Sequence, residues 1–265
     1  MESREILLYL ALKHKGDWNP IYEDISKHVE INHEEAEKLI STVKSSYITI
    51  LDEEYPESLK NAYKPPFVLF YYGDISLISD KNNKIAVVGS RKATKYGKEM
   101  TDMMVKGISK DFVIVSGMAI GIDAAAHRAA ISSGGKTIGI LGNGIDFHYL
   151  EENKDIYEEC RKNHLVISEY PGDTPPSPAC FPIRNRIIAG LCNNLLVTEG
   201  KVRSGTQITA LLMTQKSGNV CCVPTRAGED SICNHLIKEG AYLVETIDDI
   251  YVFTGVTPQK PIFEN

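Results

Sequence analysis

Long apolar runs and paired cysteines are both missing from this 265-residue sequence. No apolar run approaches the roughly 20 residues of a membrane-spanning helix. The N-terminal stretch MESREILLYLALKHKGDW has no small-residue cleavage site, unlike a signal peptide. The six cysteines form no C-x-x-C pair, and Cys221 and Cys222 are adjacent in an apolar run, which suits neither a zinc site nor a disulfide framework. These absences predict a cytoplasmic protein with no membrane partner, no metal and no cofactor.

Positive charge is also scarce overall. The net charge is −6, which argues against a generally basic nucleic-acid binder. Residues 81–110 are an exception, because they hold eight lysines and arginines against Glu99 and Asp102 and so carry +6. A local patch of this size can bind anions whatever the overall balance, although a solvated helix face is the plainer interpretation.

Apolar runs alternate with helical patterns from residue 84 onward. The predicted strands are 84–88, 112–116, 137–141, 164–168, 194–198, 219–223 and 241–245. Predicted helices lie between them, for example over 95–110 and 121–133. This alternation is typical of a parallel sheet with helical crossovers. It predicts an α/β, Rossmann-like fold with a mostly parallel sheet and helices on both faces.

The chain divides into four predicted segments. Residues 1–46 contain three short helical patterns, over 4–14, from Pro20 to 29, and after an Asn32 cap, and form a small all-helical domain. Residues 47–83 form a connector whose two strand-like runs flank Pro65 and Pro66 and add edge structure. The core covers 84–253. The tail, 254–265, leaves no room for a winged-helix module.

Glycine is scarce where a dinucleotide-binding fingerprint would need it. In IAVVGSRKATKYG, residues 85–97, Gly89 follows an apolar run, but Ser90, Arg91 and Lys92 stand in the turn. Backbone N–H groups at a strand-to-helix turn attract anions, and Arg91 adds a planar fork of donors. The motif predicts an anion-binding turn with a built-in cation, and a surface turn with a chance arginine is the alternative.

The segment FPIRNRIIAGL (181–191) places Arg184, Asn185 and Arg186 at the start of a predicted helix. Small and polar residues also follow three other predicted strands, in VSGMAIG (115–121), ILGNG (140–144) and TEGKVRSG (198–205). Because the carboxyl ends of parallel strands meet at one edge of a sheet, these loops predict one shared site. The candidate phosphate-binding residues are Gly89, Ser90, Arg91, Lys92, Ser116, Gly117, Met118, Ala119, Gly121, Arg184, Asn185, Arg186, Ser204, Gly205 and Thr206.

Four residues are predicted to support this site. Asp123 and His127 are four apart and share a helix face, either as an acid/base pair or as a first-turn aspartate that holds a nearby histidine. Glu169 is a possible carboxylate partner for the arginines at 184 and 186, and Asn234 is read as a helix cap. The aromatic residues near the loops, which suit either stacking or packing, are Tyr96, Phe147, Tyr149 and Phe181.

Taken in order, these motifs resemble the DNA-processing protein A family (DprA, also called Smf). The matching stretches are GSR at 89–91, SG-x-A-x-GID at 116–123, LG-x-G-x-D at 141–146, SE-x-P-G at 168–172, FP-x-RNRIIAGL at 181–191, SG-x-x-ITA at 204–210 and N-x-LI-x-x-GA at 234–241. The resemblance implies a Rossmann-like core that binds and protects incoming single-stranded DNA and helps to load the RecA recombinase during natural transformation. It also implies a homodimer and a SAM-like helical domain at 1–46, and it implies no enzymatic activity.

An enzymatic function is the alternative interpretation of this sequence. The core is also similar to nucleotide-processing phosphoribohydrolases, which cleave an N-glycosidic bond and carry a glutamate shortly after a Gly-Thr pair. Here Gly205 and Thr206 are followed by Gln207 and no carboxylate, and glycosidic cleavage needs a placed acid or base. Asp123, His127 and Glu169 are the remaining candidates for that role. A pure interaction scaffold is a third reading, against which the anion-ready loops argue.

Overall fold

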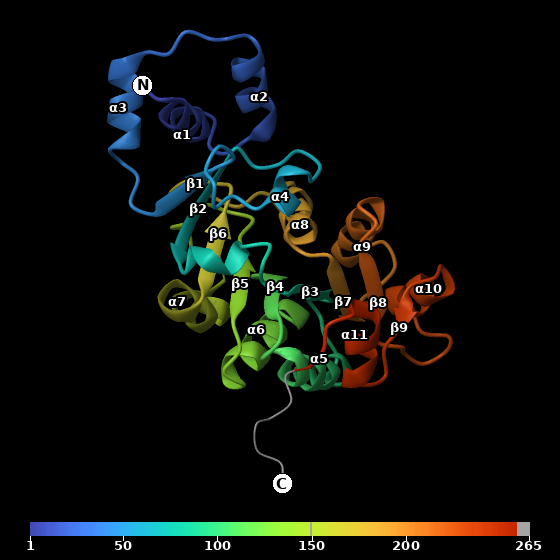
Figure 1. The fold of residues 1–265 in the computed structure, drawn as a ribbon. Coiled ribbons are helices and arrows are strands. Elements are labelled where there is room, and N and C mark those ends of the chain that lie inside the picture. Colours follow the sequence, from blue (N-terminus) through green and yellow to red (C-terminus); the bar gives the residue numbers. More distant parts are fainter. Residues whose placement is uncertain (149, 259–265) are drawn as a thin grey trace.

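Nine strands form one sheet in the order β1-β2-β6-β5-β4-β3-β7-β8-β9 in the computed structural model, which describes residues 1–148 and 150–258 (Figure 1). The strands are β1 (Ser46–Thr49), β2 (Val68–Gly73), β3 (Lys84–Gly89), β4 (Val113–Gly117), β5 (Thr137–Ile140), β6 (Leu165–Ser168), β7 (Asn194–Glu199), β8 (Asn219–Cys222) and β9 (Tyr242–Leu243). The longer helices are α1 (Ser3–Lys13), α2 (Trp18–Ser26), α3 (His33–Ile40), α5 (Lys95–Ile108), α6 (Ile122–Ser132), α7 (Lys154–Asn163), α8 (Cys180–Leu191), α9 (Gly205–Gln215), α10 (Ile232–Lys238) and α11 (Ile247–Thr254). Short turns of helix are α4 (Glu57–Lys60), η1 (Ile75–Ile78) and η2 (Glu151–Asn153).

The seven strands from β3 to β9 run parallel, whereas β1 and β2 pair antiparallel at one edge. Each of the seven strands predicted from the sequence is present, so the α/β, mostly parallel fold is confirmed. The chain reverses its direction of growth across the sheet at β3, which has β4 on one side and β7 on the other. In open α/β sheets ligands bind outside the carboxyl ends of the strands at such a switch point, which here is the end of β3.

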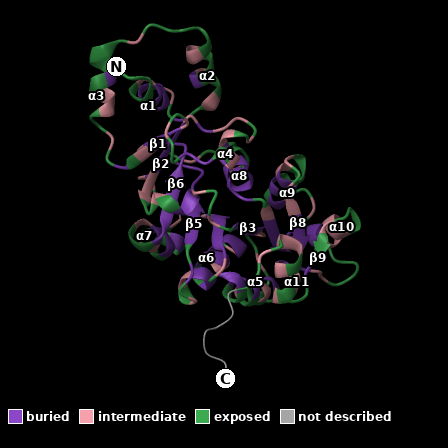
Figure 2. Cartoon of the chain, viewed as in Figure 1, coloured by how far each residue is buried: buried purple, intermediate pink, exposed green. Residues whose placement is uncertain are grey.

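Successive side chains of β3 are buried on opposite faces of the sheet. Ala86 and Val88 belong to an apolar cluster with α8, α9 and α10, while Ile85 and Val87 belong to a second cluster with α5, α6 and α11. Because strand side chains alternate with a period of two, both faces need helical cover when every residue of a strand is apolar. The central strands are accordingly buried, whereas the helices around them have both buried and exposed residues (Figure 2).

Helices α1–α3 pack beyond the β1–β2 edge. Leu8 and Leu10 of α1 are buried in one apolar cluster with Phe70 of β2 and Ile156 of α7. The Asn32 side chain caps α3, as predicted, by accepting a hydrogen bond from the Glu35 amide. Helix α2 differs from the prediction, because it begins at Trp18.

The cap of α2 is Asp17, whose side chain accepts from the Asn19 amide, so Pro20 is the third helical residue and not the first. A proline is still tolerated there, because the first-turn N–H groups of a helix have no partner within the helix. None of the helices in the described part of the chain is long and apolar enough to cross a membrane. The predicted tail lies partly outside the described residues.

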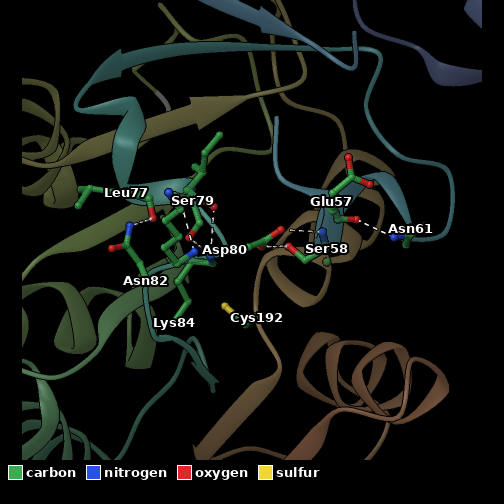
Figure 3. A network of polar contacts seen from close by, with 12 residues as sticks. Glu57, Ser58, Asn61, Leu77, Ser79, Asp80, Asn82, Lys84 and Cys192 are labelled. Carbon is green, nitrogen blue, oxygen red and sulfur yellow. Dashed lines mark hydrogen bonds and ion pairs between the residues drawn. The ribbon is translucent and has the colours of Figure 1, made fainter. Parts of the chain in front are cut away.

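A buried lysine ties the connector to the far end of β3 from the switch point. The Nζ atom of Lys84 donates to the carbonyls of Ile78 at 3.0 Å and Ser79 at 2.5 Å, and the Asp80 carboxylate lies 3.6 Å away. Figure 3 shows Lys84 among Ser79, Asp80 and Cys192. Asp80 in turn accepts hydrogen bonds from the amide and hydroxyl of Ser58 at the start of α4. Burial raises the pKa of the nearby Cys192 thiol to about 12, so this cysteine is an unreactive packing residue. Lys84 therefore has a structural role.

Candidate nucleic-acid interface

A cleft of about 1380 Å³ follows the carboxyl ends of the strands at the switch point. Its walls come from the turn after β3, the start of α8, the turn after β7 and the length of α9, and it continues past α9 to the start of β8 and to the segment from α10 to β9. The residues of the predicted set that line it are Gly89, Ser90, Arg91, Lys92, Ala119, Asp123, Arg184, Asn185, Ser204, Gly205 and Thr206. The fold therefore brings most of the predicted loops to one concave surface.

Arg91 is exposed in this cleft. Its guanidinium carbon lies 4.8 Å from the centre of the Phe181 ring, a cation–π contact, and it has no hydrogen-bond partner among the described residues. Phe181 stands in the first turn of α8 and is half-buried. All of the hydrogen-bond donors of the guanidinium consequently remain available to a ligand in the cleft.

A second hollow of about 160 Å³ lies on the other side of Arg91 and Phe181, and both residues line it. Phe147 and Tyr157 give it aromatic walls, and Lys154 adds a cation. The sequence reading missed Lys154, which stands at the start of α7 and outside the loops that follow strands. Tyr96 contacts neither hollow and donates a hydrogen bond to the Pro224 carbonyl at 2.9 Å, and Tyr149 lies outside the described residues.

Arg184 and Asp123 lie deeper in the cleft wall, and both are buried. Arg184 donates through Nη1 to the Ile140 carbonyl and through Nε to the Asn185 side chain. Burial raises the pKa of Asp123 to about 6, although Arg184 and Arg91 act in the opposite direction. Burial also lowers the pKa of Arg184. The cleft therefore contains a carboxyl group that changes charge near neutral pH.

His127 does not pair with Asp123, so the predicted contact between them is wrong. The histidine is fully buried, with Nδ1 2.7 Å from the Thr137 hydroxyl and Nε2 2.8 Å from the Gly117 carbonyl. Burial lowers its pKa to about 4, so the ring is neutral near pH 7. Its Nε2–H donates to the Gly117 carbonyl, while Nδ1 and the Ile114 carbonyl, 2.8 Å from the Thr137 hydroxyl, are the two acceptors for the single proton of that hydroxyl. Both ring nitrogens are therefore occupied inside the core, which leaves neither free for catalysis. His127 instead holds the end of β4.

The loop after β4 contributes backbone shape more than contacts. Ser116 is buried and its hydroxyl donates to the Val87 carbonyl at 2.7 Å, so it joins two strands and does not face the cleft. Gly121 has φ +87°, and a Cβ there would lie 2.2 Å from the Ser90 carbonyl oxygen. Only glycine allows this close approach of the β4 loop to the β3 turn. Met118 lines the smaller hollow, and its carbonyl accepts from Asn153 at 3.0 Å.

Arg186 lies outside both hollows. Its Nη2 atom is 2.5 Å from the Glu169 carboxylate, and both residues are buried. The structural arginine–carboxylate pair, one of the two readings of this motif, is therefore what the fold forms. Asn185, between the two arginines, donates to the Gly205 carbonyl at 3.3 Å and links α8 to the start of α9.

The turn before α9 brings two exposed cations to the cleft, Lys201 and Arg203. Arg203 has φ +60°, and its amide donates to the Gln207 side chain at 2.8 Å. The Ser204 hydroxyl donates to the Lys201 carbonyl at 2.6 Å and does not cap the helix. The sequence-based prediction named only the small residues of this motif, although both cations stand beside them in KVRSGT.

Two further predictions need correction. Asn234 is not a helix cap: Ser231 caps α10, and Asn234 accepts from the Thr225 amide and donates to the Thr225 carbonyl, both at 3.0 Å. The +6 segment is not a single anion-binding patch either. Of its eight cations only Arg91 and Lys92 line the cleft, because Lys84 is buried at the far end of β3, Lys81 precedes that strand, and the other four lie on or just after α5.

Comparisons with known proteins give matches to one family. The family model of DNA recombination-mediator protein A matches residues 46–255. DNA processing protein DprA of Streptococcus pneumoniae is 43% identical over 204 residues, which cover 76% of this chain and 72% of that protein. The corresponding Bacillus subtilis protein is 40% identical over 207 residues, covering 77% and 69%.

Solved structures give the same result. The X-ray structure of DprA from Streptococcus pneumoniae superposes with a TM-score of 0.82 at 33% identity, covering 95% of this chain and 98% of that one. A structure of DNA processing protein A from Helicobacter pylori, described for its single-stranded DNA binding mode, superposes with a TM-score of 0.71 at 28% identity, covering 82% and 99%. The chain therefore belongs to the DNA recombination-mediator protein A family.

Proposed function

We propose that this chain binds single-stranded DNA along the strand-end cleft, with phosphates contacting Arg91 and the start of α9. The observation that carries the proposal is the exposed Arg91 guanidinium, stacked on Phe181 with its donors free. A guanidinium fork matches a pair of phosphate oxygens. Single-strand binding proteins combine such cationic grooves with aromatic side chains on which bases stack.

The cleft suits a chain of phosphates better than a small cofactor. Its volume of about 1380 Å³ exceeds the roughly 300–1,000 Å³ of common small-molecule pockets. Lys92, Lys201 and Arg203 add positive charge along its walls. The smaller hollow, with its aromatic walls and Lys154, suits a base that turns away from the backbone.

The other predicted residues take supporting roles in this proposal. Gly117 and Gly121 shape the β4 loop, and Arg186 and Glu169 hold α8 against the sheet. We assign DNA contacts to Arg91, Lys92, Ala119, Arg184, Asn185 and Ser204–Thr206, together with Lys201 and Arg203.

The chain is not an enzyme in this proposal. Of the three candidate acid/base residues only Asp123 lines the cleft, because both nitrogens of His127 are hydrogen-bonded and Glu169 is paired with Arg186. Incubation with nucleoside monophosphates should release no free base. Release of base that is lost in Asp123→Asn would establish the hydrolase alternative.

Its place in the cell would be recombination, with protection of incoming strands and loading of a RecA-type recombinase during natural transformation. The family description as a recombination mediator supports this role. A homodimer would form through β9, which has no further strand beside it among the described residues. Tyr242 and Leu243 are 51% and 46% exposed on that edge, and an unpaired apolar strand edge favours pairing with another chain.

An electrophoretic shift of labelled oligonucleotide, single strand against duplex, tests the central claim. We expect retardation of the single strand at protein concentrations that leave the duplex free, and equal retardation of both would contradict it. Recombinase filament growth on strands already coated with a single-strand binding protein tests the loading step. Sedimentation of the wild type against Leu243→Glu tests the dimer, which should dissociate in the variant.

A further inference from the structure

Glu199, the last residue of β7, holds both ends of the turn that carries Arg91. Its backbone oxygen accepts from the Ser90 amide at 2.9 Å. Its carboxylate accepts from the Thr94 amide at 3.0 and 3.2 Å and from the Thr94 hydroxyl at 2.7 Å. Arg91, Lys92 and Ala93 lie between these two anchors, so one residue fixes the turn at each end.

The glycines of the GSRKATKYG motif make room for this glutamate. A Cβ on Gly97 would lie 1.9 Å from the Oε2 atom of Glu199, and a Cβ on Gly89 would lie 2.6 Å from its backbone oxygen. Contacts this short do not occur between real atoms, so side chains at 89 and 97 would displace Glu199. Gly89 and Gly97 therefore leave room for a contact inside the chain.

Three of the helices that begin near the cleft, α5, α6 and α9, differ at their N-termini. At α5 the Glu199 carboxylate lies against the first turn, where a negative charge is favourable. At α6 the Ile122 amide donates to the Ser90 carbonyl at 3.1 Å. At α9 the Ser204 hydroxyl is turned to the Lys201 carbonyl, and the Gly205 and Thr206 amides have no partner among the described residues. Of these three, α9 is the N-terminus left open to a phosphate.

We propose that Glu199 is a positioning residue for DNA binding: it clamps the Gly89–Thr94 turn so that Arg91 faces the cleft, and it fills the N-terminus of α5 so that phosphates are directed to α9. The proposal rests on the proposed function. Dinucleotide-binding domains leave the corresponding helix start to a pyrophosphate, whereas here a carboxylate of the chain occupies it.

The change in DNA affinity on removal of the carboxylate distinguishes the two ways in which Glu199 could act. If Glu199 acted only through its charge, Glu199→Ala would tighten DNA binding, because a negative charge beside the phosphates would be lost. If it positions Arg91, the same variant weakens binding. We expect a loss of about tenfold, the scale of losing charge-assisted hydrogen bonds. Glu199→Gln keeps one oxygen for the Thr94 amide and should lose less.

Fluorescence anisotropy with labelled oligothymidine of about 20 nucleotides, a few site sizes long, measures these affinities. Wild-type protein is measured first, since failure of the wild type to bind would overturn the proposed function itself. Binding by the wild type together with equal or tighter binding by Glu199→Ala would overturn only the role of Glu199.

A double-mutant cycle separates positioning from a general loosening of the fold. Arg91→Ala and Arg203→Ala are each made in the wild type and in Glu199→Ala. We expect the effect of Arg91→Ala to shrink in the Glu199→Ala background, while Arg203→Ala, on the α9 side, keeps its full effect. Equal shrinkage of both effects would contradict the proposal.

Thr94 offers a second route that leaves Glu199 in place, should Glu199→Ala fail to fold. Thr94→Val removes the hydroxyl that donates to the carboxylate, and Thr94→Ser keeps it as the matched control. We expect weaker oligothymidine binding by Thr94→Val than by Thr94→Ser. Equal affinity of the two variants would count against the clamp.

Discussion

The guanidinium of Arg91 lies over the ring of Phe181, 4.8 Å from its centre, and the pair forms the wall between the two hollows. A cation stacked on a ring keeps its donors in the plane of the guanidinium, so they point past the ring and into the space beside it. A strand of DNA that crossed this wall would meet the arginine with its phosphates and the aromatic walls of the smaller hollow with a base. The wall is therefore the part of the site where substitutions should be most informative.

Replacing Arg91 should weaken binding and reduce its dependence on salt. Each phosphate contact that is lost lowers the slope of log K against log salt by about 0.7 for a single strand. We expect Arg91→Ala to bind more weakly in anisotropy titrations from low to moderate salt. Its slope of log K against log salt should be smaller than that of the wild type by about 0.7. Lys110→Ala, at the exposed end of α5, is the control and should leave both unchanged. Unchanged affinity and slope in Arg91→Ala would remove Arg91 from the interface.

Replacing Phe181 should act through Arg91. Phe181→Leu keeps apolar volume at the start of α8 but removes the cation–π contact, which is worth about 0.5–1 kcal/mol at exposed sites. We expect Phe181→Leu to lower the DNA affinity several-fold in the protein that retains Arg91. The same substitution in Arg91→Ala should cost less, and equal costs in the two backgrounds would show that Phe181 contributes independently of Arg91.

The sequence predicted the fold better than the site, for a physical reason. Apolar runs such as 85–88 are buried whatever lies beside them, so period and length were enough to predict the seven parallel strands. The role of a polar residue depends on its neighbours across the sheet. Arg184 and Arg186 are two residues apart in one motif, yet one lines the cleft and the other pairs with Glu169.

Pairing across long sequence distances explains what the sequence reading missed. Glu199 meets Thr94 from 105 residues away, and Asn234 meets Thr225 through a loop whose shape no local pattern predicts. Lys154 lines the same hollow as Phe181 because α7 and α8 both begin beside it. The strand-end rule, which collects loops without reference to their sequence, predicted only that the loops after the parallel strands would meet.

Asp123 should make DNA binding depend on pH. Burial raises its pKa to about 6, and an approaching phosphate favours the protonated form further. The complex therefore binds more protons than the free protein, so affinity should rise as the pH falls from about 7.5 to about 5.5. Asp123→Asn, which is neutral throughout, should bind at pH 7.5 as tightly as the wild type does at low pH.

The measurement is the slope of DNA affinity against pH over that range, compared between the wild type and Asp123→Asn. Every other titratable group is the same in the two proteins, so its contribution to the slope cancels in this comparison. The part that Asp123 contributes is the part lost in Asp123→Asn. Identical slopes for the two proteins would exclude a role for Asp123 in proton uptake.

The Glu169–Arg186 pair should matter for stability and not for DNA contact. Both side chains are buried, and the Nε and Nη1 atoms of Arg186 have no hydrogen-bond partner, so Glu169 neutralises an otherwise isolated charge. Breaking a buried pair from one side typically costs about 3–5 kcal/mol. We expect a loss of that order for Glu169→Ala in denaturant unfolding.

Replacing both members of the pair tests the reason for that cost. The double variant Glu169→Leu with Arg186→Met leaves no buried charge and should be more stable than Glu169→Ala alone. Folded protein of either variant should keep its affinity for oligonucleotide, because neither residue lines the cleft. A Glu169→Ala protein as stable as the wild type would show that the arginine finds another partner.

Two replacements of Arg203, by glycine and by alanine, should differ in thermal stability but lose the same amount of DNA affinity. Its φ of +60° is unfavourable for any residue with a Cβ, whereas glycine adopts it freely. Arg203→Gly removes the cation and the strain, and Arg203→Ala removes only the cation. We expect Arg203→Gly to unfold at a higher temperature than Arg203→Ala, by the equivalent of about 1 kcal/mol. Both should lose DNA affinity equally, since each lacks the charge that faces the cleft. A larger loss of affinity in the glycine variant would mean that the strained turn, and not the guanidinium alone, shapes the start of α9 for its phosphate.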